Sequence, residues 1–391
     1  MSRSKRWIGG ILAALVVLMV LVPFVAPGVT DRGMNKRSAE PPYTLSPEGA
    51  ALQKQLMVAD LHNDVLLWGR DITRRADHGH VDLPRLRDGN FGIVVFSTVT
   101  QTPKGINYQS NDSSTDRIRL LAVLGGWPPR TWNSRLQRAL YESDRLYDAA
   151  ARTRDELLVI TKASQVDSVL ARRARGETVI GALLSTEGLH ALDGKLESVD
   201  TLFAHGFRLL GLTHFFDNDV GASAHGLSHA GLTPFGRMVI HRMELLHMIV
   251  DVAHASPQVV QEVLAMSTRP VIVSHTGVQA TCPGPRNLTD DQLRAIAATG
   301  GVVGIGFWDG AICEPSAASA AKAIRHAVNV AGIDHVALGS DWDGATTEPF
   351  DASGIGLVTG ELLKQGFTAE DIAKIMGGNV VRVMKKALPP E

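Results

Sequence analysis

The sequence predicts an α/β fold: a (β/α)8 barrel of the TIM type with an inserted helical segment, preceded by an N-terminal anchor or signal helix. Three observations lead to this prediction. Apolar, β-branched runs alternate with amphipathic stretches along most of the 391 residues. Eight such runs can be counted. Residues that bind metal or move protons stand where six of the runs stop, and in a parallel barrel such strand ends converge on one pocket.

The eight predicted strands are 57–61, 92–98, 179–185, 207–213, 248–253, 271–274, 301–307 and 335–340. A ninth possible strand lies at 157–161, inside the long segment 101–174 that follows the second strand. Apolar residues at three- and four-residue spacing predict helices at 116–124 and 134–154 in that segment. We therefore expect an inserted helical lobe between the second and third strands.

The N-terminus is predicted to lie outside the fold. Arg3, Lys5 and Arg6 precede an apolar stretch, 7–29, whose core of roughly 20 residues is long enough to span a bilayer. The alternatives are an uncleaved signal anchor and a cleaved signal peptide, and the lack of a convincing Ala-x-Ala site favours the anchor. The expected organisation is thus an anchor or signal at 1–29, a linker at 30–47 rich in Pro, Ser and charge, and a catalytic domain at 48–391.

Composition narrows the classes of partner. The chain has 39 Lys and Arg against 40 Asp and Glu, and aromatic residues make up 5% of it. A balanced charge without a basic stripe argues against a nucleic-acid partner, so we expect a small-molecule substrate. The two cysteines, Cys282 and Cys313, are too few for a disulfide scaffold. From the residues alone, a single bridge and two buried thiols remain equal alternatives.

Five of the strand-end residues have the character of a binuclear metal site. His62 and Asp64 are two residues apart, so both side chains point to the same side of an extended strand end, and together they suit Zn²⁺. His254 and His275 follow successive strands and are expected to be neighbours. Glu187 follows a strand between these groups, where its carboxylate could bridge two cations. Two ions about 3.5 to 4 Å apart can ionise a bridging water and polarise a carbonyl. The alternative is that each residue is a hydrogen-bonded cap of a strand or helix.

Three further residues suit catalysis or substrate binding. Asp341, after the last strand, is placed to act as general base and then as general acid. His214 could donate a hydrogen bond to a developing oxyanion, or it could be a structural histidine. Arg286, in a Pro/Gly loop, suits bidentate capture of a substrate carboxylate, with an ordinary solvated arginine as the alternative. For Asp343, which precedes Gly344, turn chemistry is the favoured interpretation.

From about Leu56 to Lys386 the chain resembles the membrane dipeptidases, also called renal dipeptidases, a zinc peptidase family (M19) related to the amidohydrolases. The resemblance rests on the order and context of several motifs: His-Asn-Asp from His62, His-x-Asp-Leu-Pro-Arg-Leu-Arg from His80, Thr-Glu-Gly around Glu187, Leu-Thr-His ending at His214, Asp-Val-Ala-His ending at His254, Val-Ser-His ending at His275, Pro-Arg-Asn around Arg286, and Gly-Ser-Asp-Trp-Asp-Gly around Asp341. The run after His214 departs from the usual substrate-side loop of the animal members.

The resemblance implies two zinc ions with a hydroxide between them. It implies that His62, Asp64 and Glu187 hold one ion and that Glu187, His254 and His275 hold the other. It further implies that His214 assists the tetrahedral intermediate, that Arg286 binds the terminal carboxylate of a dipeptide, and that Asp341 moves the proton to the leaving amine. A disulfide between Cys282 and Cys313 and a homodimer are also implied.

Three hypotheses about function follow. The first is a zinc-dependent dipeptidase that releases free amino acids, held through its N-terminal helix at the cytoplasmic membrane of the cell envelope with its catalytic domain in the periplasm. The second keeps the two metals but changes the bond, as an amidase, lactonase or acyl-amino-acid hydrolase acting on an exported metabolite. The third is a non-catalytic protein that binds metal or peptide, which the complete set of expected ligands disfavours.

Overall fold

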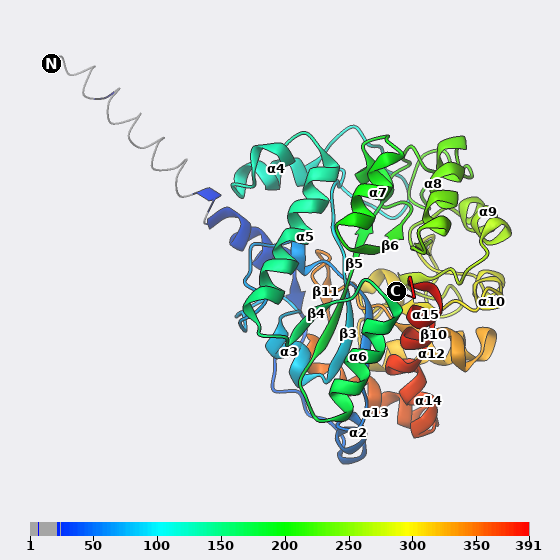
Figure 1. The fold of residues 1–391 in the computed structure, drawn as a ribbon. Coiled ribbons are helices and arrows are strands. Elements are labelled where there is room, and N and C mark those ends of the chain that lie inside the picture. Colours follow the sequence, from blue (N-terminus) through cyan, green and yellow to red (C-terminus); the bar gives the residue numbers. More distant parts are fainter. Residues whose placement is uncertain (1–6, 8–21, 24, 391) are drawn as a thin grey trace.

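The computed structural model describes residue 7, residues 22–23 and residues 25–390. Its centre is a curled, parallel β-sheet surrounded by helices (Figure 1). Strands occur at all eight predicted places: β2 (Val58–Asn63), β3 (Phe91–Phe96), β5 (Ile180–Glu187), β6 (Phe207–Gly211), β7 (Ile249–Asp251), β8 (Val273–Thr276), β9 (Val303–Ile305) and β10 (Val336–Leu338). The α/β class is confirmed, and the curled sheet is consistent with the predicted TIM-like barrel.

The strands pair in two groups, β2-β3-β5-β6-β7 and β8-β9-β10, and all of these pairings are parallel. Single bridges connect the groups at both seams. Asp251 bridges to Ile272 beside β8, and Asn63 of β2 bridges to Trp342 beyond β10. At the second seam Asp64 N donates to Trp342 O at 2.9 Å. The carboxyl ends of the strands therefore share one face, as parallel pairing requires.

Alternate residues of a strand enter two different core clusters, because successive side chains point to opposite faces. In β2, Val58 belongs to the larger cluster, while Ala59 and Leu61 belong to the second. All six residues of β2 are buried. Burial of both faces explains why the strand runs are largely apolar in the sequence, as expected for a parallel sheet covered by helices.

The segment between the second and third predicted strands contains the two expected helices, α4 (Arg117–Leu124) and α5 (Arg135–Arg152). Each begins at a capping side chain, because Asp116 accepts from Arg119 N and Ser134 accepts from Gln137 N. The possible ninth strand is also present as β4 (Leu157–Val159), which pairs with β5 outside the main strand order.

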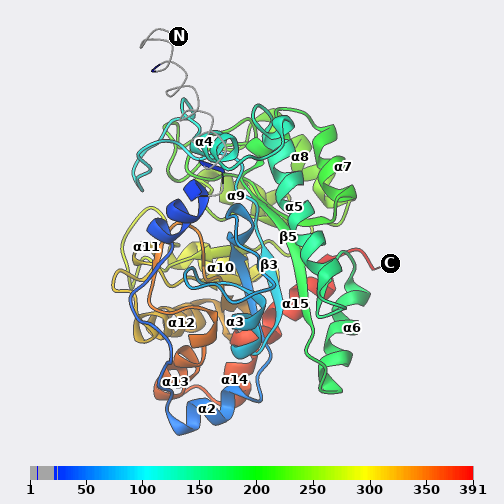
Figure 2. The ribbon, with the colours of Figure 1, turned by 90° about the vertical axis from the view of Figure 1, so that its left-hand side faces the viewer.

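Helices cover the outside of the sheet in both views (Figures 1 and 2). They are α2 (Pro47–Gln53), α3 (Leu83–Asp88), α6 (Ala163–Ala174), α7 (Glu197–Ala204), α8 (Pro234–Leu245), α9 (Pro257–Met266), α10 (Asp290–Ala298), α11 (Asp309–Ile312), α12 (Ala317–Ala331), α13 (Gly356–Lys364), α14 (Ala369–Ala373) and α15 (Asn379–Ala387). Short 3-10 turns precede or follow several of them, including Val65–Leu67 directly after Asp64.

The predicted membrane helix falls largely on residues outside the described part of the chain. Among the residues described, no helix has the length and apolar character needed to cross a membrane. Residues 30–47, for which the sequence predicts a tether, contact the barrel. The strand β1 (Lys36–Arg37) pairs with β11 (Thr347–Glu348), and the side chain of Asp31 is buried. The sequence pattern missed this packing because it depends on distant partners, and the strand pairing joins positions more than 300 residues apart.

Candidate active site

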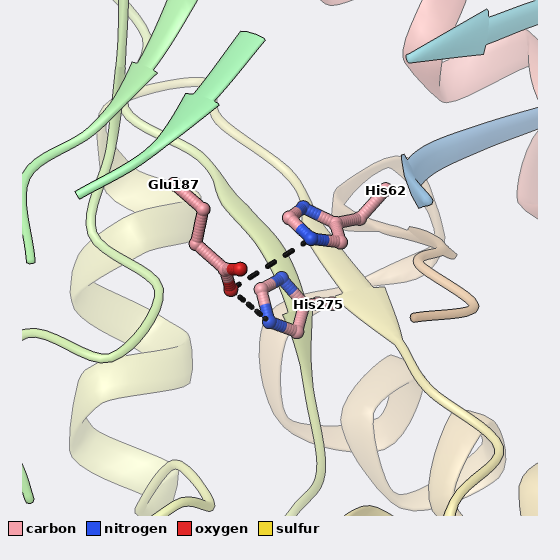
Figure 3. Close-up of side chains that lie close together, drawn as sticks. All are labelled: His62, Glu187 and His275. Carbon is pink, nitrogen blue, oxygen red and sulfur yellow. Dashed lines mark ion pairs between the residues drawn. The ribbon is translucent and has the colours of Figure 1, made fainter. Parts of the chain in front are cut away.

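Glu187 is the centre of a buried group of histidines at the carboxyl face of the sheet. Its Oε1 lies 3.0 Å from His254 Nε2, 3.2 Å from His275 Nε2 and 3.7 Å from His62 Nε2. Figure 3 shows the His62 and His275 rings directed at this carboxylate. The strands β2, β5 and β8 extend further than predicted and include His62, Glu187 and His275 themselves. The sequence-predicted residues therefore meet at one point.

Two more carboxylates and one more histidine complete the group. Asp64 Oδ1 lies 3.4 Å from His62 Nε2, and His214 Nε2 lies 3.2 Å from Glu187 Oε2. The ligand atoms of His62, Asp64 and Asp341 also lie within 4.8 Å of one another. His214 is thus close enough to share a cation with Glu187 and His254. The structure thus places His214 and Asp341 directly beside the predicted ligands.

Burial shifts the protonation of this cluster. It raises the pKa of Glu187 well above its ordinary value, with the Asp64 charge adding to the effect. Burial also raises the pKa of Asp341 to about 7. For His62, burial lowers the pKa, but the charges of Asp64 and Glu187 outweigh it and bring the value to about 10. Without a bound cation, the raised pKa values mean that protons stay on this cluster, where several carboxylates face one another.

The donor set fits divalent zinc. Imidazole and carboxylate are ligands that Zn²⁺ prefers, and a cation supplies the positive charge that protons otherwise bring to this cluster. His62 Nε2 and Asp64 Oδ1 are buried and lack a hydrogen-bond partner within the part of the chain that the structure describes. Buried polar atoms without partners are rare in folded proteins, so their placement beside one another is itself a reason to expect an ion there.

A layer of polar groups behind the histidines fixes their orientation. Ser274 Oγ lies 2.9 Å from His275 Nδ1 and 3.4 Å from His62 Nδ1. Asp60 accepts from both the backbone and the hydroxyl of Ser340, and that hydroxyl donates to His62 O at 2.9 Å. Such outer contacts fix the ring nitrogen that faces a metal. Sequence reasoning missed Ser274 and Ser340, although each directly precedes a predicted site residue.

Unusual backbone conformations hold several site residues. His254 and Asp341 both have φ of 60°, in the left-handed region that non-glycine residues rarely occupy. Such conformations persist where surrounding contacts enforce them, and they cluster at functional sites. Gly188, directly after Glu187, has φ of 92°, and a Cβ there would collide with the His190 ring and approach His214 Cβ at 3.2 Å. The Thr-Glu-Gly motif thus requires its glycine.

Arg286 lies beside this group with its guanidinium directed into the protein. It is 5% exposed, it donates from Nη2 to His275 O at 2.7 Å, and its Cζ lies 5.3 Å from the centre of the Trp308 ring. It is therefore not an ordinary solvated arginine. Tyr108, which the sequence did not indicate, accepts a 3.0 Å hydrogen bond from Trp308 Nε1 and lines the same cavity.

A disulfide joins Cys282 and Cys313 next to the Arg286 loop, as the family resemblance implied. Asn287 strengthens the same region, because its Nδ2 donates to Cys282 O at 2.7 Å and to Gly310 O at 3.0 Å. The loop that presents Arg286 is consequently connected to the segment after β9 both covalently and by hydrogen bonds.

Loss of this disulfide is expected to destabilise the protein. The bridged residues are 31 positions apart. Closing a loop of that length stabilises a protein by roughly 3 to 4 kcal/mol, so the double variant Cys282→Ala/Cys313→Ala should melt roughly 4 °C lower. Thermal unfolding with and without reductant measures the effect. Reductant should lower the melting temperature of the unmodified protein and leave that of the double variant unchanged. Equal melting temperatures for both proteins would contradict the prediction.

The site opens into a cavity of about 670 Å³. Its floor carries the titratable residues of the site, namely Asp64, Glu187, His214, His254 and Asp341. Asp343, by contrast, is buried away from this cavity, where it pairs with Arg70 at 2.7 Å and accepts from the backbone N–H groups of His80 and Val81. Asp343 is a structural residue with a positive φ of 64°.

Comparisons with known proteins show the family of this chain. A family model described as membrane dipeptidase (peptidase family M19) matches residues 48–388. An uncharacterized dipeptidase of Schizosaccharomyces pombe is 31% identical over 320 residues, which cover 78% of this chain and 72% of the relative. Dipeptidase aclJ of Aspergillus oryzae is 28% identical over 401 aligned positions, which cover 95% of this chain and 86% of the relative.

A solved structure has the same fold. The metallo peptidase from Rhodobacter sphaeroides, solved with a phosphinate mimic of the dipeptide L-Ala-D-Ala, superposes with a TM-score of 0.70 at 24% identity. The superposition covers 85% of this chain and 99% of the other. At that identity the likeness concerns the fold.

The predicted location is wrong. The sequence led us to expect a bacterial envelope protein anchored in the cytoplasmic membrane, with its catalytic domain in the periplasm. The relatives from Schizosaccharomyces pombe and Aspergillus oryzae are fungal dipeptidases, and fungi have no bacterial periplasm. A basic start followed by an apolar run suggested the location, but that pattern does not by itself identify a cell type.

Proposed function

The chain belongs to the membrane dipeptidase family, peptidase family M19, and is a peptide-bond hydrolase, and we propose that it is a dipeptidase that uses two zinc ions at the site around Glu187. The observation that carries the proposal is the convergence of three histidines on a single carboxylate oxygen, within 3.0 to 3.7 Å. We further propose that residues 48–391 form the catalytic domain, which the span of the family model supports.

The proposed ligands follow the shared carboxylate. His62 and Asp64 with Glu187 would hold one ion, and His254 and His275 with Glu187 would hold the other. Bound zinc would supply a water ionised at neutral pH and a Lewis acid for the scissile carbonyl. The contacts of Ser274 to both His62 and His275 support this arrangement, because they direct the Nε2 atoms of the two rings toward Glu187.

Asp341 and His214 are proposed to act on the substrate. Asp341 is half-buried and lines the cavity, and its pKa, which its surroundings raise to about 7, suits a group that accepts a proton and passes it to a leaving amine. Burial lowers the pKa of His214 well below its ordinary value, so the ring is neutral and can donate one N–H to an oxyanion. Both side chains line the cavity.

Arg286 is proposed to bind the free carboxylate of the dipeptide, and its replacement should discriminate between substrates. Arg286→Gln should lower kcat/KM for a free dipeptide by roughly 100-fold, because a charge-assisted pair of hydrogen bonds is lost. The same dipeptide with an amidated C-terminus should be affected far less. Steady-state kinetics on the matched pair of substrates, with zinc present, measures the difference.

A suitable control is Arg294→Gln, since Arg294 is an exposed residue of α10 that pairs with Asp291. It should alter neither substrate's kinetics. An equal loss on free and amidated substrates for Arg286→Gln would remove the carboxylate-binding role. Failure of the zinc-loaded, unmodified enzyme to hydrolyse any dipeptide would overturn the proposed function as a whole.

A further inference from the structure

The cavity has two chemically different sides above its polar floor. Arg286 and Trp308 lie on the side of β8 and β9, where Tyr108 joins them. The opposite side, next to β2 and β3, is mainly apolar, although Arg117 at the start of α4 also lines the cavity. It is formed by Leu67 and Trp68, at the end of the turn after Asp64, and by Val99, Ile118 and Leu121. A substrate that reaches across the floor therefore meets a cation at one end and an apolar surface at the other.

An additional part of the apolar side comes from the N-terminal arm, which we define as residues 25–38. Residues 25–34 are helical and lie beside α4 in both views (Figures 1 and 2). Ala26, Thr30 and Met34 are spaced four residues apart, so they share one helix face, and all three line the cavity. Met34 packs against the cluster that contains Leu67 and Trp68. Val25 and Val29 lie on the outer face and are exposed.

Buried polar contacts attach the arm firmly to the rim of the site. The fully buried carboxylate of Asp31 lies 2.8 Å from Arg70 Nε and accepts from Asn35 Nδ2 at 2.7 Å. The same Arg70 pairs with Asp343 at 2.7 Å. Asn35 Oδ1 accepts from Ala345 N at 2.9 Å, within the segment that follows Asp341. The arm is thus held to the loop that carries Asp341.

Strand pairing adds a second attachment. Lys36 N donates to Thr346 O at 3.2 Å, and Ser38 N donates to Glu348 O at 2.8 Å. Thr346 and Ala345 themselves line the cavity. Because buried polar contacts and a parallel strand pair fix the arm from Asp31 to Ser38, the helix that precedes them is held against the cavity with its inner face as a wall.

We infer that the N-terminal arm forms part of the subsite for the side chain of the substrate's N-terminal residue, and that this subsite selects large apolar side chains. The inference rests on the proposed function. With the substrate carboxylate on Arg286 and the scissile bond over Glu187, the N-terminal residue extends toward β2 and β3. Its side chain there contacts Met34 and Ala26 together with Leu67 and Trp68. The arm lies outside the residues that the family model matches, 48–388.

Two substitutions with opposite effects on volume test the inference. Ala26→Trp fills the apolar side and should lower kcat/KM for Leu-Ala and Trp-Ala by roughly tenfold or more, while Gly-Ala is retained, because hydrophobic subsites discriminate by 10- to 200-fold. Met34→Ala removes a contact, so it should raise KM for Leu-Ala and Trp-Ala several-fold and leave KM for Gly-Ala unchanged. The measured quantity is the ratio of kcat/KM between the large and small substrates, with zinc present in all assays.

Val29→Trp is the matched control, because it adds the same side chain to the outer face of the same helix. It should leave the ratio unchanged. Melting temperatures show whether each variant is folded, and Met34→Ala, which only removes atoms, tests the inference if Ala26→Trp is unfolded. Unchanged ratios in folded variants of an active enzyme would overturn the role of the arm while the proposed function stands. An unmodified enzyme that hydrolyses none of the three dipeptides would overturn both.

Discussion

Asp341→Asn is expected to reduce kcat by roughly 10² to 10⁴-fold, the range that general acid–base groups contribute. Asparagine preserves the size of the side chain but can neither accept nor deliver the proton that the leaving amine requires. Asp341 is half-buried, lines the cavity and lies with His62 and Asp64, so its carboxylate stands beside the proposed ligands. Steady-state kinetics on a free dipeptide measures the loss.

Metal content distinguishes a catalytic role of Asp341 from a ligand role. If Asp341 moves protons, Asp341→Asn should retain the same number of zinc ions per chain as the unmodified enzyme, as measured by elemental analysis. Asp291→Asn, at an exposed position of α10, should change neither activity nor metal content. Loss of one zinc equivalent from Asp341→Asn would instead make this residue a ligand. Full activity of the variant would exclude it from the reaction.

Glu187→Gln is expected to have the largest effect on metal binding. Glutamine has nearly the same shape as glutamate, but it lacks the negative charge of the carboxylate that lies next to three histidine nitrogens. Mutation of residues that only hydrogen-bond to metal ligands already lowers metal affinity by about 10- to 100-fold. Loss of a bridging carboxylate should therefore weaken zinc binding by more than about 100-fold. We expect the purified variant to contain less than one zinc per chain and to be inactive. In the unmodified enzyme, chelation should abolish activity and added zinc should restore it.

Glu142→Gln is a stringent control because Glu142 is also a buried carboxyl close to the site. Burial raises the pKa of Glu142 well above its ordinary value, so its carboxyl is neutral, and its Oε2 accepts from Val99 N at 3.2 Å. Glutamine can accept the same bond. This variant should bind zinc as the unmodified enzyme does. Two zinc ions tightly bound to Glu187→Gln would contradict the bridging role.

The sequence predicted the strands and the convergence of their ends because both depend on local periodicity. The run that begins at Val58 is mainly apolar and is buried throughout, which marks a strand covered by helices, and His62 stands near its end. Parallel pairing then brings His62 and Glu187 together whatever the details of the connections are. The residues behind them, such as Ser274 and Asp60, have no periodic signal of their own, so only the folded chain reveals their contacts.

Residues contributed by irregular segments were not predictable in the same way. Tyr108 belongs to a loop without helical or strand spacing, and its contact with Trp308 joins positions 200 residues apart. The predicted cellular location was wrong for a different reason. An apolar N-terminal run indicates affinity for a membrane, but it does not identify the type of cell that contains the protein. The buried pairing of Asp31 with Arg70 likewise contradicts the solvated character that Pro, Ser and charge usually indicate.

The attachment of residues 25–38 to the rim has a practical consequence for work on this enzyme. A protein shortened to the boundaries of its family, residues 48–388, would retain every proposed zinc ligand. It would nevertheless leave Arg70 without Asp31 and one side of the cavity open to water. A substrate survey on such a fragment would describe a more permissive enzyme than the natural one. The residues that the family shares contain the proposed zinc ligands, whereas the arm that we infer to select substrates lies before the first of them.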